Sequence, residues 1–139
     1  MSYLLDTNVI SEWMKPQPNP GVVAWLAAMD EDRVFISVVT LTEVRYGIER
    51  MPAGIRRKRV ENWLLRELPS RFEGRVLAVD EAVADASGRA AARSEAAGRP
   101  MDAIDAFLAG TAEVYRLTLV TRNRSDFKAA LKTTLNPWT

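Results

Sequence analysis

The chain contains no cysteine and no histidine among its 139 residues. The lack of cysteine excludes disulfides, a thiol nucleophile and thiolate metal ligands. The lack of histidine excludes Ser-His-Asp and Cys-His catalysis, a histidine general base and histidine-ligated zinc. Any catalysis must therefore use carboxylates, Lys, Arg, Tyr or hydroxyl groups. A bound metal would need oxygen ligands, which favour a hard cation such as Mg²⁺ or Mn²⁺.

Long hydrophobic runs and a strong excess of one charge are also missing. No stretch approaches the roughly 18 apolar residues of a membrane span, and Asp6 interrupts the first apolar run too early for a signal peptide. We therefore expect a soluble, cytoplasmic protein that forms a single domain over residues 1–139. The formal net charge is only +1, so a nucleic-acid partner would have to bind a local basic patch.

Short apolar or β-branched runs alternate with longer helical patterns. The predicted strands cover residues 2–5, 33–39, 75–79 and 118–121, and the tail after residue 133 predicts an edge strand. Helices are predicted from Thr7 onward and over residues 22–29, 40–51, 53–68, 81–98, 102–117 and 125–131. This alternation favours an α/β fold whose mostly parallel sheet is covered on both faces. In such sheets ligands bind outside the edge formed by the C-terminal ends of the strands.

Acidic residues lie at or near the C-terminal ends of the predicted strands. Asp6 follows the first strand, Glu43 comes shortly after the second, and Asp126 lies just beyond the last. Asp102 and Asp105 open the preceding helix and share one of its faces. Converging carboxylates repel each other, each close pair by roughly a few kcal/mol. Proteins relieve this repulsion by protonation or by binding a cation.

Nearly every acid also has a purely structural alternative. Candidates for helix N-caps are Asp6, Asp80, Asp102, Ser125 and Asp126. Thr40 and Glu43 fit a capping box, in which Thr40 caps the helix and Glu43 is its third residue. Asp105 is the exception, because Asp102 already takes the cap of the same helix.

Four segments together resemble a PIN domain, and they extend over nearly the whole chain. They are LLDTNVISE, ISVVTLTEVRYGI, DAIDAFLAGTA and LVTRNRSDF, in that order. Their order and spacing resemble VapC-type ribonuclease toxins of bacterial toxin–antitoxin pairs, and the segments PQPN, GRVLAVDE and NPW are most similar to the FitB-like branch. The resemblance implies a PIN-like three-layer α/β/α sandwich with a central, mostly parallel sheet of about four or five strands. It also implies an Mg²⁺- or Mn²⁺-dependent endoribonuclease that hydrolyses RNA phosphodiesters.

The resemblance assigns metal binding and catalysis to four acids. They are Asp6, Glu43, Asp105 and Asp126. The fourth position has two interpretations, because Asn123 stands where FitB-like proteins carry an acid. Either Asp126 supplies the charge or Asn123 is a neutral ligand. Asp80 matches a helix-capping position and not a ligand.

Further residues are expected around these acids. Thr7, Asn8 and Asp102 would orient the ligands from behind, with simple helix capping as the alternative. Arg122, Arg124 and Arg99 are candidates for contacts with substrate phosphates, and solvated surface arginines are the alternative.

The resemblance also implies partners. It implies a homodimer and a small cognate antitoxin that carries a DNA-binding domain and neutralises the toxin. An alternative function follows from the same assembly and from Asn123. The chain would then be a catalytically weak PIN-fold subunit that acts mainly by forming a DNA-binding repressor complex with its antitoxin.

Overall fold

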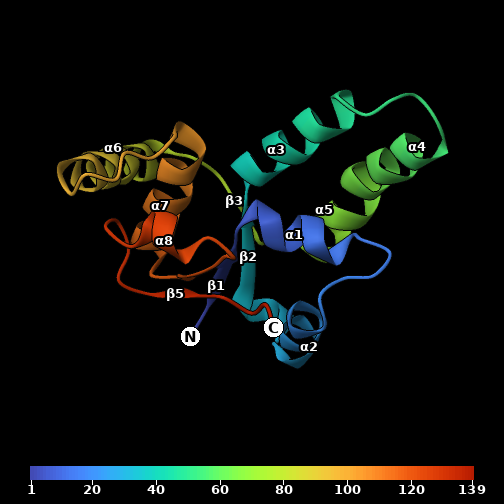
Figure 1. Cartoon of the computed structure of the whole chain (residues 1–139), viewed down its shortest axis with the longest axis horizontal. Helices are drawn as coiled ribbons and strands as arrows, with labels where there is room; N and C mark the ends of the chain where they lie inside the picture. The colour runs from blue at the N-terminus through green and yellow to red at the C-terminus, as the bar shows by residue number, and fades with distance from the viewer.

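The structure, a computed structural model that describes residues 1–139, has five strands between two groups of helices (Figure 1). In chain order the elements are β1 (Tyr3–Leu5), α1 (Thr7–Trp13), α2 (Pro20–Ala28), η1 (Glu31–Arg33), β2 (Val34–Ser37), α3 (Val38–Glu49), α4 (Ile55–Asn62), η2 (Trp63–Glu67), α5 (Leu68–Arg71), β3 (Val76–Leu77), α6 (Glu81–Ala96), α7 (Ala103–Tyr115), β4 (Thr118–Val120), α8 (Arg124–Phe127) and β5 (Thr134–Leu135). The strand order is β3-β2-β1-β4-β5, and every neighbouring pair is parallel. The predicted α/β fold with a parallel sheet is confirmed.

Successive side chains of the central strands point to opposite faces of the sheet. Leu5 of β1 and Val120 of β4 pack in one buried cluster with residues of α1, α2, α3 and α5. Leu4 and Leu119, their neighbours in the same strands, pack in a second cluster with residues of α6 and α7. In Figure 1, α6, α7 and α8 accordingly lie on one side of the strands, and α1 to α5 lie on the other. The sheet is therefore buried on both faces, as the three-layer sandwich requires.

The helix that follows β2 begins earlier than its sequence pattern predicts. The strand predicted over 33–39 ends at Ser37, and α3 starts at Val38. The Ser37 hydroxyl accepts a hydrogen bond from the Val39 N–H at 3.1 Å and caps the helix. The predicted capping box that begins at Thr40 is therefore wrong. The sequence pattern does not show where α3 starts, because Val38 and Val39 continue the apolar run of the strand into the helix.

The helical stretch from α4 to α5 contains a π-helical turn, η2. The Leu68 N–H donates to the Trp63 carbonyl, five residues earlier, and Pro69 follows directly. Because proline has no N–H to donate, a wider turn just before it accommodates the gap in the hydrogen-bond ladder. None of the helices has the length and apolar character needed to cross a membrane.

Helices α6 and α7 approach each other closely at Gly110. A Cβ atom at this position would lie 2.7 Å from the Ser87 nitrogen and 2.8 Å from the Ser87 Cα, and would overlap the Ser87 hydroxyl. The backbone of α6 thus occupies the space that any side chain at position 110 would need. Gly110 sets the separation of the two helices, and α7 carries Asp105 in its first turn.

We predict that Gly110→Ala lowers the free energy of unfolding by about 1–3 kcal/mol, because the added methyl group overpacks the helix contact. The matched control is Gly88→Ala on α6, where the new Cβ would meet nothing within 4 Å. At that exposed helical site alanine should raise the free energy of unfolding by about 0.5–1 kcal/mol. Urea denaturation of both variants tests this, and equal stability of the two would contradict it.

Candidate functional site

The four acids predicted as metal ligands come from different elements and line one cleft of about 530 Å³ at the C-terminal edge of the sheet. They are Asp6 after β1, Glu43 on α3, Asp105 on α7 and Asp126 on α8. The strand order explains their meeting, because β1 lies between β2 and β4 and the residues that follow these strands become neighbours. Thr7, Asn8, Asp102 and Asn123 line the same cleft.

Asp6 both caps a helix and faces the cleft. Its carboxylate accepts hydrogen bonds from the Thr7 N–H at 2.6 Å, as the N-cap of α1, and from the Thr121 hydroxyl at 2.8 Å. The side chain is only 7% exposed. Burial raises the pKa of Asp6, the bonds from Thr121 and Thr7 act against this, and the charges of Glu43 and Asp126 raise it further. The structural and functional interpretations of Asp6 are thus compatible in geometry.

Glu43 lies on the second turn of α3, where it has no capping role. The Thr7 hydroxyl donates a hydrogen bond to the Glu43 carboxylate and also lies 3.3 Å from the Thr40 hydroxyl. Thr40 itself is fully buried within α3. Thr7 therefore fixes the orientation of an acid that belongs to a different strand–helix unit.

Asp102 and Asp105 open α7 with different roles. Asp102 accepts a hydrogen bond from the Asp105 N–H at 2.8 Å, so its predicted N-cap role is confirmed. Burial and then the charges of Asp102, Asp6, Asp126 and Glu43 raise the pKa of Asp105 to about 7. No hydrogen bond to the Asp105 carboxylate opposes these effects. Asp80 likewise caps its helix, through the Val83 N–H at 2.9 Å, and lies outside the cleft.

Asn123 and Asp126 both line the far side of the cleft. Asn123 is the N-cap residue of α8, although its side chain makes no capping hydrogen bond, so the predicted cap by Ser125 or Asp126 is wrong. The Asn123 N–H instead donates to the Thr121 hydroxyl at 3.0 Å.

Thr121 connects several residues of the site and was missed in the sequence. It is fully buried, it donates to Asp6, and the Asn8 side-chain amide donates to it at 3.3 Å. Asn8 in turn accepts a hydrogen bond from the Arg122 N–H at 3.4 Å. A polar residue directly after β4, at the same sheet edge as Asp6, was the signal available in the sequence.

The three predicted phosphate-binding arginines lie in different places. Only Arg122 lines the cleft, and its guanidinium lies 5.6 Å from the ring centroid of Trp138. Arg99 donates to the Ser125 carbonyl at 3.0 Å and so braces α8 from outside the cleft. Arg124 donates to the Thr134 hydroxyl at 3.0 Å and lines a separate groove.

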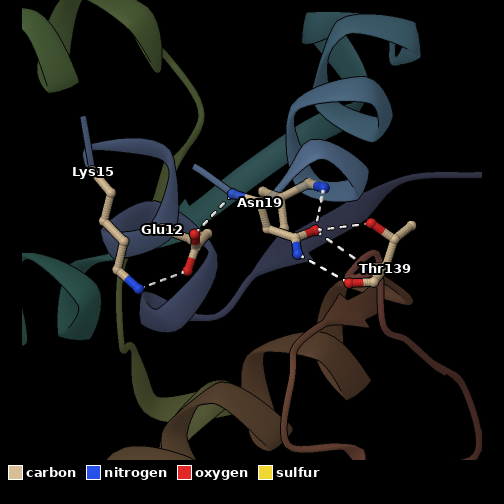
Figure 2. A network of polar contacts seen from close by, with 5 residues as sticks. Glu12, Lys15, Asn19 and Thr139 are labelled. Atoms are coloured by element: carbon tan, nitrogen blue, oxygen red, sulfur yellow. Dashed lines mark hydrogen bonds and ion pairs between the residues drawn. The ribbon is translucent and has the colours of Figure 1, made fainter. Parts of the chain in front are cut away.

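A polar network connects the C-terminal residue Thr139 through Asn19 to Glu12 (Figure 2). Glu12 accepts hydrogen bonds from Lys15 and from the Asn19 N–H, both at 2.9 Å. The hydrogen bond from Lys15 and then that from Asn19 lower the pKa of Glu12. The Asn19 side chain binds the backbone of Thr139, accepting at 3.1 Å and donating at 3.1 Å. The network places Trp138, Glu12 and Lys15 in the lining of the cleft, where sequence reasoning had not expected them.

Gly21 allows this close approach of the tail. A Cβ atom there would overlap the Pro137 carbonyl oxygen and would lie 2.9 Å from the Thr139 nitrogen. The Gly21 N–H also donates to the Asn19 carboxamide at 3.0 Å. The first turn of α2 and the tail therefore fit together only because position 21 lacks a side chain.

The chemistry of the donors fits a hard divalent cation, because the cleft offers carboxylate, amide and hydroxyl oxygens and no sulfur or imidazole. Burial and then the repulsion of neighbouring carboxylates raise the pKa of Asp105, and a bound cation relieves repulsion of this kind. The carboxylates are too far apart for a single metal ion, because no three acidic side chains form a group that could hold one. The carboxylates would have to move towards one another to bind the same ion.

Comparisons with known proteins agree with this architecture. The PIN domain family profile matches residues 3–131. The chain is 37% identical over 135 residues to Toxin FitB of Neisseria gonorrhoeae, covering 97% of each protein. It is 36% identical over 135 residues to VapC ribonuclease Y4jK of Sinorhizobium fredii, covering 97% of this chain and 96% of the relative. A chain in a solved structure of FitAB bound to an IR36 DNA fragment is similar with a TM-score of 0.92 and 35% identity, covering 99% of this chain and 96% of that one.

The raised pKa of Asp105 predicts a specific dependence of stability on pH. The folded protein holds this proton up to a pH of about 7, whereas the ordinary value is 3.8. This contribution to the free energy of unfolding is therefore fully present below pH 3.8 and is lost as the pH rises through about 7. We expect wild-type urea midpoints, measured in EDTA, to fall between about pH 4 and pH 7, and Asp105→Asn to fall less. An identical fall in the two proteins would contradict the assignment.

Proposed function

This chain belongs to the PIN domain family, and from that premise we propose that it is the ribonuclease toxin of a toxin–antitoxin pair. The observation that carries the proposal is the convergence of Asp6, Glu43, Asp105 and Asp126, from four separate elements, on one cleft. Such convergence is electrostatically unfavourable unless protons or a cation compensate it. Relatives at 36–37% identity that carry the names VapC ribonuclease and Toxin FitB support the same assignment.

We assign the four acids to binding of Mg²⁺ or Mn²⁺, with Asn123 as the alternative neutral ligand beside Asp126. When bound, such an ion supplies an activated water and polarises the phosphodiester that is cleaved. The chain's own residues prepare this site. Thr121 and Thr7 donate to Asp6 and Glu43 and fix the orientation of both carboxylates.

Other residues position the site or its substrate. Asp102 caps α7 and thereby fixes the first turn that carries Asp105. Asn8 ties the backbone at Arg122 to the start of α1. We assign Arg122 to a phosphate of the RNA, since it is the predicted arginine that lines the cleft. Arg99 and Arg124 act indirectly, by bracing α8 and the segment that leads to β5.

The partner proposal concerns a second groove, of about 910 Å³, between α1, α3 and α4. Its apolar lining consists of Met14, Val44, Ile48, Met51, Ile55, Val60 and Trp63. Ser11, Lys15 and Glu43 line both this groove and the acidic cleft, so the two are continuous. We assign the groove to the cognate antitoxin, which would reach the acids from it. Tyr46 and Leu65, which are 63% and 60% exposed, are candidates for contacts in the proposed homodimer.

One alternative function is favoured by specific observations. No three acids are grouped around a single metal position, and Asn123 stands where an acid is expected. A chain similar to this one occurs in the FitAB complex bound to DNA. The protein would then be a catalytically weak subunit that acts mainly through a DNA-binding repressor complex with its antitoxin.

Cleavage of RNA by the protein free of antitoxin distinguishes the two functions. We expect cleavage of single-stranded RNA with Mg²⁺ or Mn²⁺ and none in EDTA. Asp6→Asn should reduce the rate by about a hundredfold or more, because it removes a charged metal ligand. The control is Asp32→Asn, an exposed acid outside the cleft, which should cleave as wild type does.

Two results would count against the ribonuclease. The first is the absence of cleavage with either metal on any RNA, together with intact antitoxin binding, which would favour the repressor subunit. The second is calorimetry that detects no metal binding to the folded protein, because the carboxylate site would then lack its proposed ion.

The antitoxin assignment predicts the effect of Gly47→Gln. Gly47 lines the apolar groove on α3, and a Cβ atom there would meet nothing within 4 Å, so the new side chain fills the groove without disturbing the fold. We expect affinity for the antitoxin to fall by about tenfold or more. Gly88→Gln on α6, equally free of contacts, is the control. If titration calorimetry gives both variants wild-type affinity, the antitoxin binds elsewhere.

A further inference from the structure

A basic groove of about 930 Å³ lies on the opposite side of α8 from the acidic cleft. The C-terminal end of α7, α8 and the segment leading to β5 form its walls. Five of its lining side chains are cationic and one, Glu113, is acidic. The cations are Arg93, Arg116, Arg124, Lys128 and Lys132. Because the whole chain carries a net charge of only +1, this groove is a strong local concentration of positive charge.

Two of these cations are held in place by the protein itself. Arg93 forms an ion pair with Glu113 at 3.0 Å and also donates to the Ala130 carbonyl at 3.1 Å. Arg124 donates to the Thr134 hydroxyl at 3.0 Å. These contacts fix the positions of both arginines. The ion pair with Arg93 also neutralises Glu113, the one acid that lines the groove.

The other three cations, Arg116, Lys128 and Lys132, are exposed and take part in no ion pair. Arg116 adopts a left-handed conformation, with φ of 55°, where α7 ends. A cation at a helix C-terminus has a favourable interaction with the helix dipole, which accounts for Arg116. Lys128 is the C-cap residue of α8, a helix of only four residues, whereas Lys132 lies beyond any helix end, and both lysines line the same concavity as Arg116. Like charges so gathered repel unless an anion binds between them.

The shape and lining of the groove indicate the kind of anion. The groove has no aromatic lining residue. Of its five apolar members, Ala112, Leu117 and Ala130 are buried, and Ala129 and Leu131 are half-buried. Protein partners usually need an aromatic or other large apolar anchor at the centre of their interface. A phosphodiester backbone needs only a row of Lys and Arg side chains.

Helix α8 connects this groove to the acidic cleft. Asn123 and Asp126 line the cleft, whereas Arg124, Ser125 and Lys128 line the groove. A helix of this length is only about 6 Å long. A single strand that crosses α8 would therefore pass from the basic side chains to the acids within a few nucleotides.

We propose that the groove around Lys128 and Lys132 binds the backbone phosphates of the RNA substrate, on one side of the bond that is cleaved in the acidic cleft. The proposal rests on the ribonuclease function proposed above for the same chain. It gives the substrate a path across α8, with Arg122 at the cleft and the lysines beyond it.

The test combines Lys128→Glu with Lys132→Glu and measures RNA binding by fluorescence anisotropy in EDTA, where no metal-dependent cleavage occurs. For a single-stranded RNA of about 12 nucleotides, we expect affinity to fall about tenfold or more. The slope of log K against log salt should also become less steep, by about 1.4 for two lost phosphate contacts. A dinucleotide, too short to extend from the groove across α8, should bind wild type far more weakly than this longer RNA.

The matched control combines Arg33→Glu with Lys58→Glu, two exposed cations outside the groove and without ion pairs. It has the same change in net charge and should bind the longer RNA nearly as wild type does. Lys128→Gln with Lys132→Gln removes only the positive charges, and it keeps the test valid if the charge-reversed protein fails to fold.

Several outcomes would overturn the proposal. They are a loss of affinity that is equal in the groove and control variants, no binding of the longer RNA by wild type, and tighter binding of duplex DNA that depends on the same lysines. The last would assign the groove to DNA in a repressor complex. If wild type binds RNA through the groove but cleaves none, the ribonuclease proposal fails while the binding site stands.

Discussion

The parallel pairing of β1 with β4 is the constraint on which the site depends, and it ends at Asp6. The Asp6 N–H donates to the Val120 carbonyl at 2.9 Å as the last bond between these strands, while the Asp6 carboxylate accepts from Thr121, the next residue of the other strand, at 2.8 Å. The backbone of Asp6 therefore completes the pairing of β1 with β4, while its carboxylate lines the cleft. A register shift of a single position would turn every side chain of β1 to the opposite face, and would exchange the two cores together with the acid.

Two acids of the cleft, Glu12 and Asp105, differ in the direction of their pKa shifts, and their hydrogen-bond partners explain why. Glu12 receives hydrogen bonds from Lys15 and Asn19, which lower its pKa. Asp105 receives none, and burial with the charges of its neighbours raises its pKa to about 7. The protein thus satisfies the acid that anchors its tail and leaves unsatisfied the one that faces the other carboxylates. An acid without hydrogen-bond partners is typical of functional sites. The fold tolerates it because packing and hydrogen bonding elsewhere in the chain all favour the same structure.

The sequence allowed the parallel sheet, the helix caps at Asp80 and Asp102 and the position of Asp6 to be predicted, because each depends on a local pattern of a few residues. It misplaced the start of α3, since Val38 and Val39 suit a strand and a helix alike and the cap at Ser37 is a single hydroxyl. It also missed Thr121, Trp138 and the basic groove. These features depend on contacts between distant segments, such as Asn19 with Thr139, and on which side of α8 each residue faces. Local sequence periodicity predicts neither.

The bond between Asp6 and Thr121 joins residues that are 115 positions apart in the chain. During synthesis on a ribosome, Asp6 emerges early, whereas Thr121, Asn123 and Asp126 emerge only when most of the chain has been translated. Topologies dominated by such distant contacts also fold comparatively slowly. A partly made chain therefore has no complete acidic cleft. The ribonuclease activity proposed for this cleft could therefore appear only after translation has passed Asp126, because the order in which the residues are joined delays the complete set of acids.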